Sequence, residues 1–179
     1  MKINQVYIDL DGVLADLVLQ TQRYLGQQPL LKAGECDLTK IFKISQNELM
    51  SLFSNYNFWE EMPAFHWSKL LVEYFESFGV FIYFVTHAVD SLNAFSGKYE
   101  WFRTHLSKYK NELIFIQAEC RHLLAKEDRL LVDDSDQNVS DWILSGGQAI
   151  LFPQQWNSNW NLRDQSLQYM MDRYEELSQ

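Results

Sequence analysis

Short apolar runs and longer amphipathic stretches alternate along most of this chain. Runs of consecutive apolar residues that stop at polar or turn-forming residues are typical of buried strands. They occupy residues 6–8, 81–85, 113–116, 130–132 and 149–152. Apolar residues spaced as on one face of a helix occupy residues 67–78, 99–106, 136–144 and 167–177. Strands that alternate with helices predict an α/β fold with a parallel sheet.

The stretch between the first two predicted strands breaks this alternation. Nearly sixty residues precede the helix that begins near His66, far more than one crossover connection needs. Residues 14–25 and 46–53 have helical patterns, and turn-forming residues such as Pro29 and Gly34 separate them. We therefore expect a Rossmann-like three-layer sandwich of about five parallel strands, with a small helical cap inserted after the first strand. The expected boundaries are residues 1–16 and 64–179 for the core and 17–63 for the cap.

Two pairs of acidic residues follow predicted strands. Asp9 and Asp11 precede Gly12, which permits a sharp turn and the close approach of an anion. Asp133 and Asp134 end the fourth predicted strand. The first pair alone is equally consistent with an acidic turn, and for the second pair alone an acidic turn is the favoured interpretation. Because parallel strand ends share the edge where open α/β sheets bind ligands, the two pairs together predict hard oxygen ligands for Mg²⁺.

A hydroxyl and several basic residues are candidates to complete a phosphate site. Thr86 ends the second predicted strand, where its hydroxyl can donate to a phosphate oxygen. A phosphoryl group also needs a nearby positive charge. The candidates are Arg121 and Lys126, before the fourth strand, and Lys98, at the start of a helix. Each of them taken singly is more typical of a solvated surface charge.

These parts together resemble the four-part signature of the haloacid dehalogenase-like (HAD) phosphohydrolases. Residues 7–16, Tyr-Ile-Asp-Leu-Asp-Gly-Val-Leu-Ala-Asp, are most similar to the 5'(3')-deoxyribonucleotidase branch, including its bacterial and phage relatives. Residues 57–63, 97–102 and 130–134 add to the similarity, which extends from about residue 3 to 153. The resemblance implies the same α/β core and a phosphatase activity.

The resemblance also implies a reaction through an aspartyl-phosphate. Asp9 would be the nucleophile, and Asp11 would protonate the leaving oxygen and then activate water. Thr86 would hold a phosphate oxygen. The Asp9 carboxylate, the Asp11 carbonyl and Asp133 would bind Mg²⁺, with Asp134 close by.

The chain departs from the branch at two positions. The branch has a lysine before the paired aspartates, and matching Ala125-Lys126 to the family's Ala-Lys places Arg121 there, with Lys126 as the alternative. Arginine can bind phosphate through two hydrogen bonds but is not equivalent to lysine. His87 replaces the serine or glycine that usually follows the threonine, and its ring could donate to substrate.

Two adjacent aromatic residues lie in the expected cap. In the branch, aromatic cap residues stack on the nucleobase, so Phe58 and Trp59 are candidate substrate-binding residues together with His87 and Lys98. It is equally consistent that Phe58 and Trp59 fix the cap to the core. A cap over the site admits a small phosphomonoester more readily than a protein.

Composition and charge exclude several other classes. The 24 acidic and 15 basic residues give a net charge of −9, which argues against binding of long nucleic acid. Cys36 and Cys120 do not make a disulfide framework. No apolar run approaches the roughly 18 residues of a membrane span, and the first residues lack the apolar region of a signal peptide. We therefore expect a cytoplasmic protein with no membrane partner.

The sequence thus predicts a cytoplasmic, Mg²⁺-dependent phosphomonoesterase that acts on deoxyribonucleoside monophosphates. One alternative is a 3'-end phosphatase of polynucleotides, which the acidic charge disfavours. Another is a phosphatase of a different small metabolite. An alternative from another class is a non-catalytic module that binds a phosphorylated ligand, suggested by Arg121 but disfavoured because all four aspartates are present.

Overall fold

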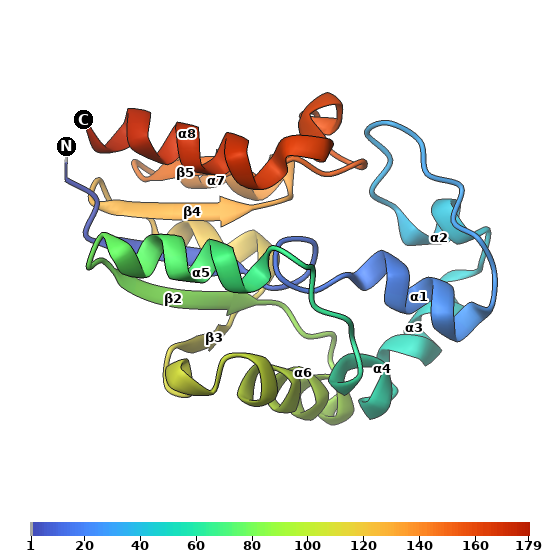
Figure 1. Cartoon of the computed structure of the whole chain (residues 1–179). Coiled ribbons are helices and arrows are strands. Elements are labelled where there is room, and N and C mark those ends of the chain that lie inside the picture. Colours follow the sequence, from blue (N-terminus) through green and yellow to red (C-terminus); the bar gives the residue numbers. More distant parts are fainter. Residues whose placement is uncertain (1) are drawn as a thin grey trace.

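The computed structural model describes residues 2–179 and has a five-stranded parallel sheet at its centre (Figure 1). The strands are β1 (Gln5–Asp9), β2 (Phe81–Thr86), β3 (Leu113–Phe115), β4 (Arg129–Asp133) and β5 (Gln148–Leu151). Their order is β3-β2-β1-β4-β5, so β1 lies between β2 and β4. This confirms the predicted α/β fold and brings the ends of β1, β2 and β4 to the middle of one edge of the sheet.

Helices cover both faces of the sheet. Side chains from α5 (Ser68–Ser77), α6 (Leu92–His105) and α8 (Ser166–Ser178) join the larger apolar core. The opposite face packs against α7 (Asp136–Leu144) and the 3-10 helix η2 (Ala118–Leu124). In β1, Ile8 belongs to the larger core, whereas Tyr7 contacts Trp142 of α7 at 5.3 Å between ring centroids. Burial of both faces of β1 explains why its residues 6–8 form a continuous apolar run.

Four short helices lie between β1 and α5. They are α1 (Leu17–Leu25), α2 (Leu38–Phe42), α3 (Gln46–Phe53) and α4 (Tyr56–Glu60). The chain leaves and rejoins the core where Ala15 and Ala64 form a β-bridge. The division of the chain into a core and a cap with boundaries at 17 and 63 remains a prediction.

The first helix begins later than the sequence pattern predicts. The side chain of Asp16 accepts a hydrogen bond from the Leu19 amide at 2.9 Å and caps α1, whereas residues 14–16 are not helical. Leu14 is instead fully buried, and its carbonyl accepts hydrogen bonds from the Phe65 amide and the Ser68 hydroxyl. Asp16 is a strong N-cap residue, so the helix starts directly after it.

Helix α6 begins earlier than predicted, at Leu92 rather than near Tyr99. Its first two turns contain polar residues and Gly97, which hide the apolar spacing. A Cβ atom at Gly97 would lie 2.5 Å from the Tyr56 carbonyl oxygen and 2.8 Å from Cβ of Trp59. The glycine therefore allows α4 to pack closely on α6. As a consequence, Lys98 lies inside the helix and not at its start.

The remaining helical turns are η1 (Ser107–Tyr109) and η3 (Trp160–Gln165), which precede β3 and α8. Among residues 2–179, no helix has both the length and the apolar character needed to cross a lipid bilayer.

Candidate active site

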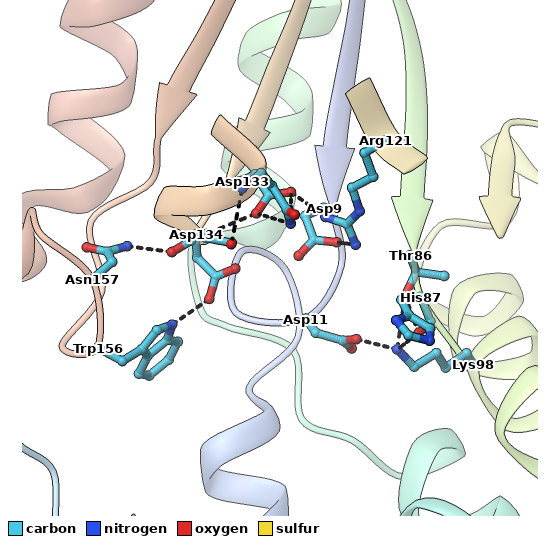
Figure 2. Close-up of polar contacts among 12 residues, drawn as sticks. Asp9, Asp11, Thr86, His87, Lys98, Arg121, Asp133, Asp134, Trp156 and Asn157 are labelled. Atoms are coloured by element: carbon cyan, nitrogen blue, oxygen red, sulfur yellow. Dashed lines mark hydrogen bonds and ion pairs between the residues drawn. The ribbon is translucent and has the colours of Figure 1, made fainter. Parts of the chain in front are cut away.

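Three strand ends bring polar side chains together at the carboxyl edge of the sheet (Figure 2). Asp9 ends β1, Thr86 ends β2 and Asp133 ends β4. All three side chains are buried, with at most 4% of their residue surface exposed. Burial of two carboxylates and a hydroxyl in one place is costly unless charged or hydrogen-bonding partners compensate. The residues that interact with these three side chains therefore indicate the chemistry of the site.

Arg121 is the positive partner of two of these carboxylates. It comes from η2, and its guanidinium lies 2.8 Å from Oδ1 of Asp9 and also pairs with Asp133. Asp133 additionally accepts hydrogen bonds from the Ser135 amide at 2.9 Å and the Asn138 side chain at 3.1 Å. Arg121 therefore ties the ends of β1 and β4 to each other.

The structure does not place Lys126 in this cluster. Its side chain is exposed after η2, and none of the hydrogen bonds and ion pairs described for residues 2–179 joins it to the acidic residues. The structure therefore favours Arg121 over Lys126 as the residue that supplies the phosphate-binding charge. Arg121 is buried beside the carboxylates instead, because η2 turns it inward before β4 begins.

Negative charge is in excess around Asp9. Burial raises the pKa of Asp9 well above its usual range, and the carboxylates of Asp133 and Asp134 add to this shift, against the lowering effect of Arg121. Burial and Asp133 raise the pKa of Asp134 to about 7. Burial alone would lower the pKa of Arg121, but Asp9 and Asp133 raise it overall, so the guanidinium stays charged.

The acidic cluster fits a divalent cation. Asp9, Asp133 and Asp134 each offer a carboxylate oxygen, and these oxygens lie within 4.8 Å of one another. Three carboxylates face the single charge of Arg121, which leaves two negative charges to balance. Oδ1 of Asp9 is near Arg121 but accepts no hydrogen bond from the described residues, so it keeps a lone pair for a ligand. Hard carboxylate oxygens are the ligands that Mg²⁺ prefers.

A second basic residue faces Asp11 on the other side of the loop after β1. Lys98 of α6 is 2% exposed, pairs with Oδ2 of Asp11 and lies 3.0 Å from the Thr86 hydroxyl. It also donates to the His87 carbonyl, and its ammonium group lies 4.3 Å from the centre of a Trp59 ring. Figure 2 shows the Asp11 side chain pointing toward Lys98 and away from the other aspartates. Lys98 thus joins Asp11 to the end of β2.

His87 lies beside this ion pair and is half-buried. Burial lowers the pKa of His87, and the charge of Lys98 lowers it further. The ring is therefore neutral at pH 7 and can donate one hydrogen bond to a bound anion.

The segment after β5 contributes residues that sequence reasoning missed. The indole nitrogen of Trp156 donates to Oδ2 of Asp134 at 2.5 Å, and the Asn157 side chain donates to the Asp134 carbonyl at 2.9 Å. The Gln154 side chain donates to the Gly12 carbonyl. The only sequence signal for these residues is that the segment follows a strand whose end lies at the same sheet edge.

A pocket of about 370 Å³ opens beside Asp11 and Asp134. One side is polar and comes from the core, and the other is largely apolar and comes from the predicted cap. The lining residues include Asp11, Gly12, Asp134, Ser135 and Trp156 on the first side and Leu17, Val18, Cys36, Leu38 and Ile41 on the second. This volume is within the range of pockets that bind small organic ligands.

Phe58 and Trp59 do not line this pocket. Phe58 is fully buried, with the Tyr24 ring at 5.2 Å and the Phe53 ring at 5.6 Å. Trp59 is 2% exposed, and its indole nitrogen donates to the Phe53 carbonyl. The structure therefore favours the interpretation that this pair packs the α1–α4 segment against α6 over stacking on a base.

We expect replacement of Phe58 to reduce stability and leave substrate affinity unchanged. Phe58→Ala removes a fully buried ring and should lower the free energy of unfolding by about 3–5 kcal/mol. Denaturant unfolding measures this loss, and KM for a nucleotide is determined with the milder Phe58→Leu. An increase in KM with no loss of stability would instead indicate contact between Phe58 and the substrate.

Comparison with known proteins adds a family match over almost the whole chain. The family model described as "5' nucleotidase, deoxy (Pyrimidine), cytosolic type C protein" matches residues 2–173. A search of curated protein sequences finds no match.

Solved structures are similar to this chain at low sequence identity, and the first of those described here shares its fold. A HAD family hydrolase from Deinococcus radiodurans R1, with bound phosphate and sodium, is 12% identical, with a TM-score of 0.52 over 82% of this chain and 79% of that one. A hydrolase from Streptococcus pneumoniae TIGR4 is 19% identical, with a TM-score of 0.49 over 92% and 98% of the two chains. A HAD family enzyme from Bacteroides thetaiotaomicron, in complex with magnesium and inorganic phosphate, is 13% identical, with a TM-score of 0.48 over 86% and 95%.

Proposed function

Because this chain belongs to the family of cytosolic type C 5'-deoxynucleotidases, we propose that it releases phosphate from deoxyribonucleoside monophosphates at the cluster around Asp9. The family match confirms the predicted resemblance to HAD-like phosphohydrolases and the enzyme class, phosphatase. The observation that carries the proposal is the arrangement of Asp9 and Asp11. Asp9 ends the buried strand β1, Asp11 lies in the loop that follows it, and each has its own basic partner, Arg121 for Asp9 and Lys98 for Asp11.

In the proposed reaction, Asp9 is the nucleophile. A carboxylate oxygen of Asp9 bonds to phosphorus while the bond from phosphorus to the ester oxygen breaks, which gives an aspartyl-phosphate and an alcohol. Water then attacks phosphorus, the bond to Asp9 breaks, and inorganic phosphate leaves. Arg121 lies where it can interact with both Asp9 and the phosphoryl oxygens, and its charge counters the charge that develops there.

Asp11 moves the protons in both steps. Its Oδ2 is held by Lys98, whereas its buried Oδ1 accepts no hydrogen bond from residues 2–179. Oδ1 is therefore the oxygen that protonates the leaving alcohol and then takes a proton from the attacking water. Thr86 and His87 are the proposed donors to the phosphate oxygens at the end of β2.

Mg²⁺ is the proposed metal, held by the carboxylates of Asp9 and Asp133 and by the Asp11 carbonyl, with Asp134 close by. When bound, it would neutralise the carboxylates and the phosphoryl group as a Lewis acid. The raised pKa values of Asp9 and Asp134 support this proposal, because a cation would favour their ionised forms. The family's description as cytosolic supports a cytoplasmic location.

Phosphate release from a panel of substrates tests the function. The panel contains deoxy- and ribonucleoside 5'- and 3'-monophosphates, sugar phosphates and a 3'-phosphorylated oligonucleotide, each with Mg²⁺ and with EDTA. We expect Mg²⁺-dependent release that is fastest from deoxyribonucleoside monophosphates. Metal-dependent release from sugar phosphates alone would keep the chemistry and contradict the substrate. Binding without turnover anywhere in the panel would support the non-catalytic alternative.

A further inference from the structure

The segment after β5 holds both loops that carry the aspartates. Gln154 and Asn157 are buried, and they donate to the carbonyls of Gly12 and Asp134, respectively. Asn157 also donates to the Phe152 carbonyl at 2.8 Å, which fixes the segment to the end of β5. Such hydrogen bonds to main-chain carbonyls set the path of each loop. The segment is therefore part of the frame of the site.

Trp156 is the member of this segment that contacts a carboxylate. Its indole N–H donates to Oδ2 of Asp134 (Figure 2). Gly12 allows the Asp134 carboxylate to lie close to the loop after β1, because a Cβ atom at Gly12 would overlap this carboxylate. Gly12 also has a φ of 84°, a conformation that favours glycine. The hydrogen bond from Trp156 therefore favours one orientation of the Asp134 carboxylate.

The same side chain also borders the pocket. Trp156 is half-buried, and it lines the cavity together with the apolar side chains Leu38 and Ile41. The neighbouring Gln155 carbonyl accepts a hydrogen bond from the Gly34 amide at 3.2 Å, so the segment also contacts the loop before α2. An aromatic face at this place offers a stacking surface to a planar group in the pocket.

We propose that Trp156 positions Asp134 through its N–H group and forms, with its ring, the wall against which the nucleobase packs. This inference rests on the proposed function and deepens it by assigning the base to the Trp156 side of the site rather than to Phe58 and Trp59. One side chain then serves both ends of the substrate complex. The N–H group acts on Asp134 beside the proposed metal site, and the ring acts on the organic part of the substrate.

Two substitutions separate these roles. Trp156→Phe keeps an aromatic face and removes the N–H group, so we expect the Kd for Mg²⁺ to rise about tenfold or more with little change in nucleotide KM. Trp156→Gln keeps an N–H donor and removes the ring, so we expect nucleotide KM to rise about fivefold or more and the Mg²⁺ Kd to stay near that of the wild type. Trp160→Phe is the matched control, because Trp160 is 42% exposed and does not line the pocket.

Titration calorimetry with Mg²⁺ alone measures the metal affinity without any turnover. Saturation kinetics with the best deoxyribonucleoside monophosphate give KM and kcat at saturating Mg²⁺, and thermal unfolding checks that each variant is folded. A rise in the Mg²⁺ Kd for Trp156→Phe and a rise in nucleotide KM for Trp156→Gln, with both constants unchanged in Trp160→Phe, would support the inference. Folded variants that both match the wild type in Mg²⁺ Kd and in KM would overturn it while leaving the proposed function intact. A wild-type protein that neither binds Mg²⁺ nor releases phosphate would overturn the proposed function as well.

Discussion

Asp9→Asn should abolish turnover, with a loss of about 10⁴-fold or more in kcat. The asparagine is nearly the same size as aspartate but cannot form the acyl phosphate, because its amide is a poor nucleophile. Stability should not fall. Burial and the neighbouring carboxylates raise the pKa of Asp9, so its ionised form is destabilised in the folded protein. A neutral asparagine removes this unfavourable charge. Phosphate release and thermal unfolding, both with and without Mg²⁺, measure the two effects.

The control for this variant is Asp164→Asn. The Asp164 side chain is 84% exposed in η3, and its loss should leave both rate and stability unchanged. Trapping of a labelled phosphoenzyme by acid quench gives a second readout, since it should succeed with the wild type and fail with Asp9→Asn. An Asp9→Asn protein that still turns over substrate would exclude Asp9 as the nucleophile.

Arg121→Met should greatly reduce stability. It leaves Asp9 and Asp133 buried without their positive partner, and the loss of one member of a buried ion pair costs about 3–5 kcal/mol. Arg121→Lys should retain part of this stability and part of the activity, because lysine keeps the positive charge but cannot form the bidentate contacts of a guanidinium group. Denaturant unfolding in EDTA measures the difference without a contribution from bound metal.

The deficit of Arg121→Met should depend on pH in a defined direction. Without Arg121 the folded-state pKa of Asp9 rises further above its unfolded value, so the folded form gains from protonation at low pH. This advantage is present below the unfolded pKa and is lost as pH rises through the folded pKa. We therefore expect a smaller deficit at pH 5 than at pH 8. A deficit that does not change between these values would contradict the charge argument.

Arg173→Met is the matched control. Arg173 forms an exposed ion pair with Glu176 on α8, and such pairs contribute little to stability. Its substitution should change the free energy of unfolding by less than about 0.5 kcal/mol at either pH. A comparable loss in both variants would show that the effect of Arg121 is not specific to the buried cluster.

Local pattern was sufficient for the fold and for the strand-end residues. Continuous apolar runs are short and bounded, so they predicted β1 to β5 to within about one residue at each end. The location of Asp9, Thr86 and Asp133 then follows from a general property, since parallel strands end at a common edge. The acidic character of the site was therefore determined by the sequence itself.

The first residues of the helices were harder to predict from the sequence than the strands, for a physical reason. Helix α6 begins with a mixture of apolar residues, polar residues and Gly97, which obscures the apolar spacing. Its early start becomes evident only when α4 packs against Gly97. That contact, between residues distant in sequence, buries Lys98 beside Asp11, 87 positions earlier in the chain.

Tertiary structure alone decided which side chains complete the site. Arg121 and Lys126 are five positions apart and both positively charged, yet only Arg121 is turned inward by η2. The packing of α4 buries Phe58, and the segment after β5 brings Trp156 to Asp134. Residue type and spacing determine strands and their ends because those are local properties of the chain. The pairing of side chains across the site depends on how separate helices and strands pack against one another. Local sequence patterns do not predict this packing.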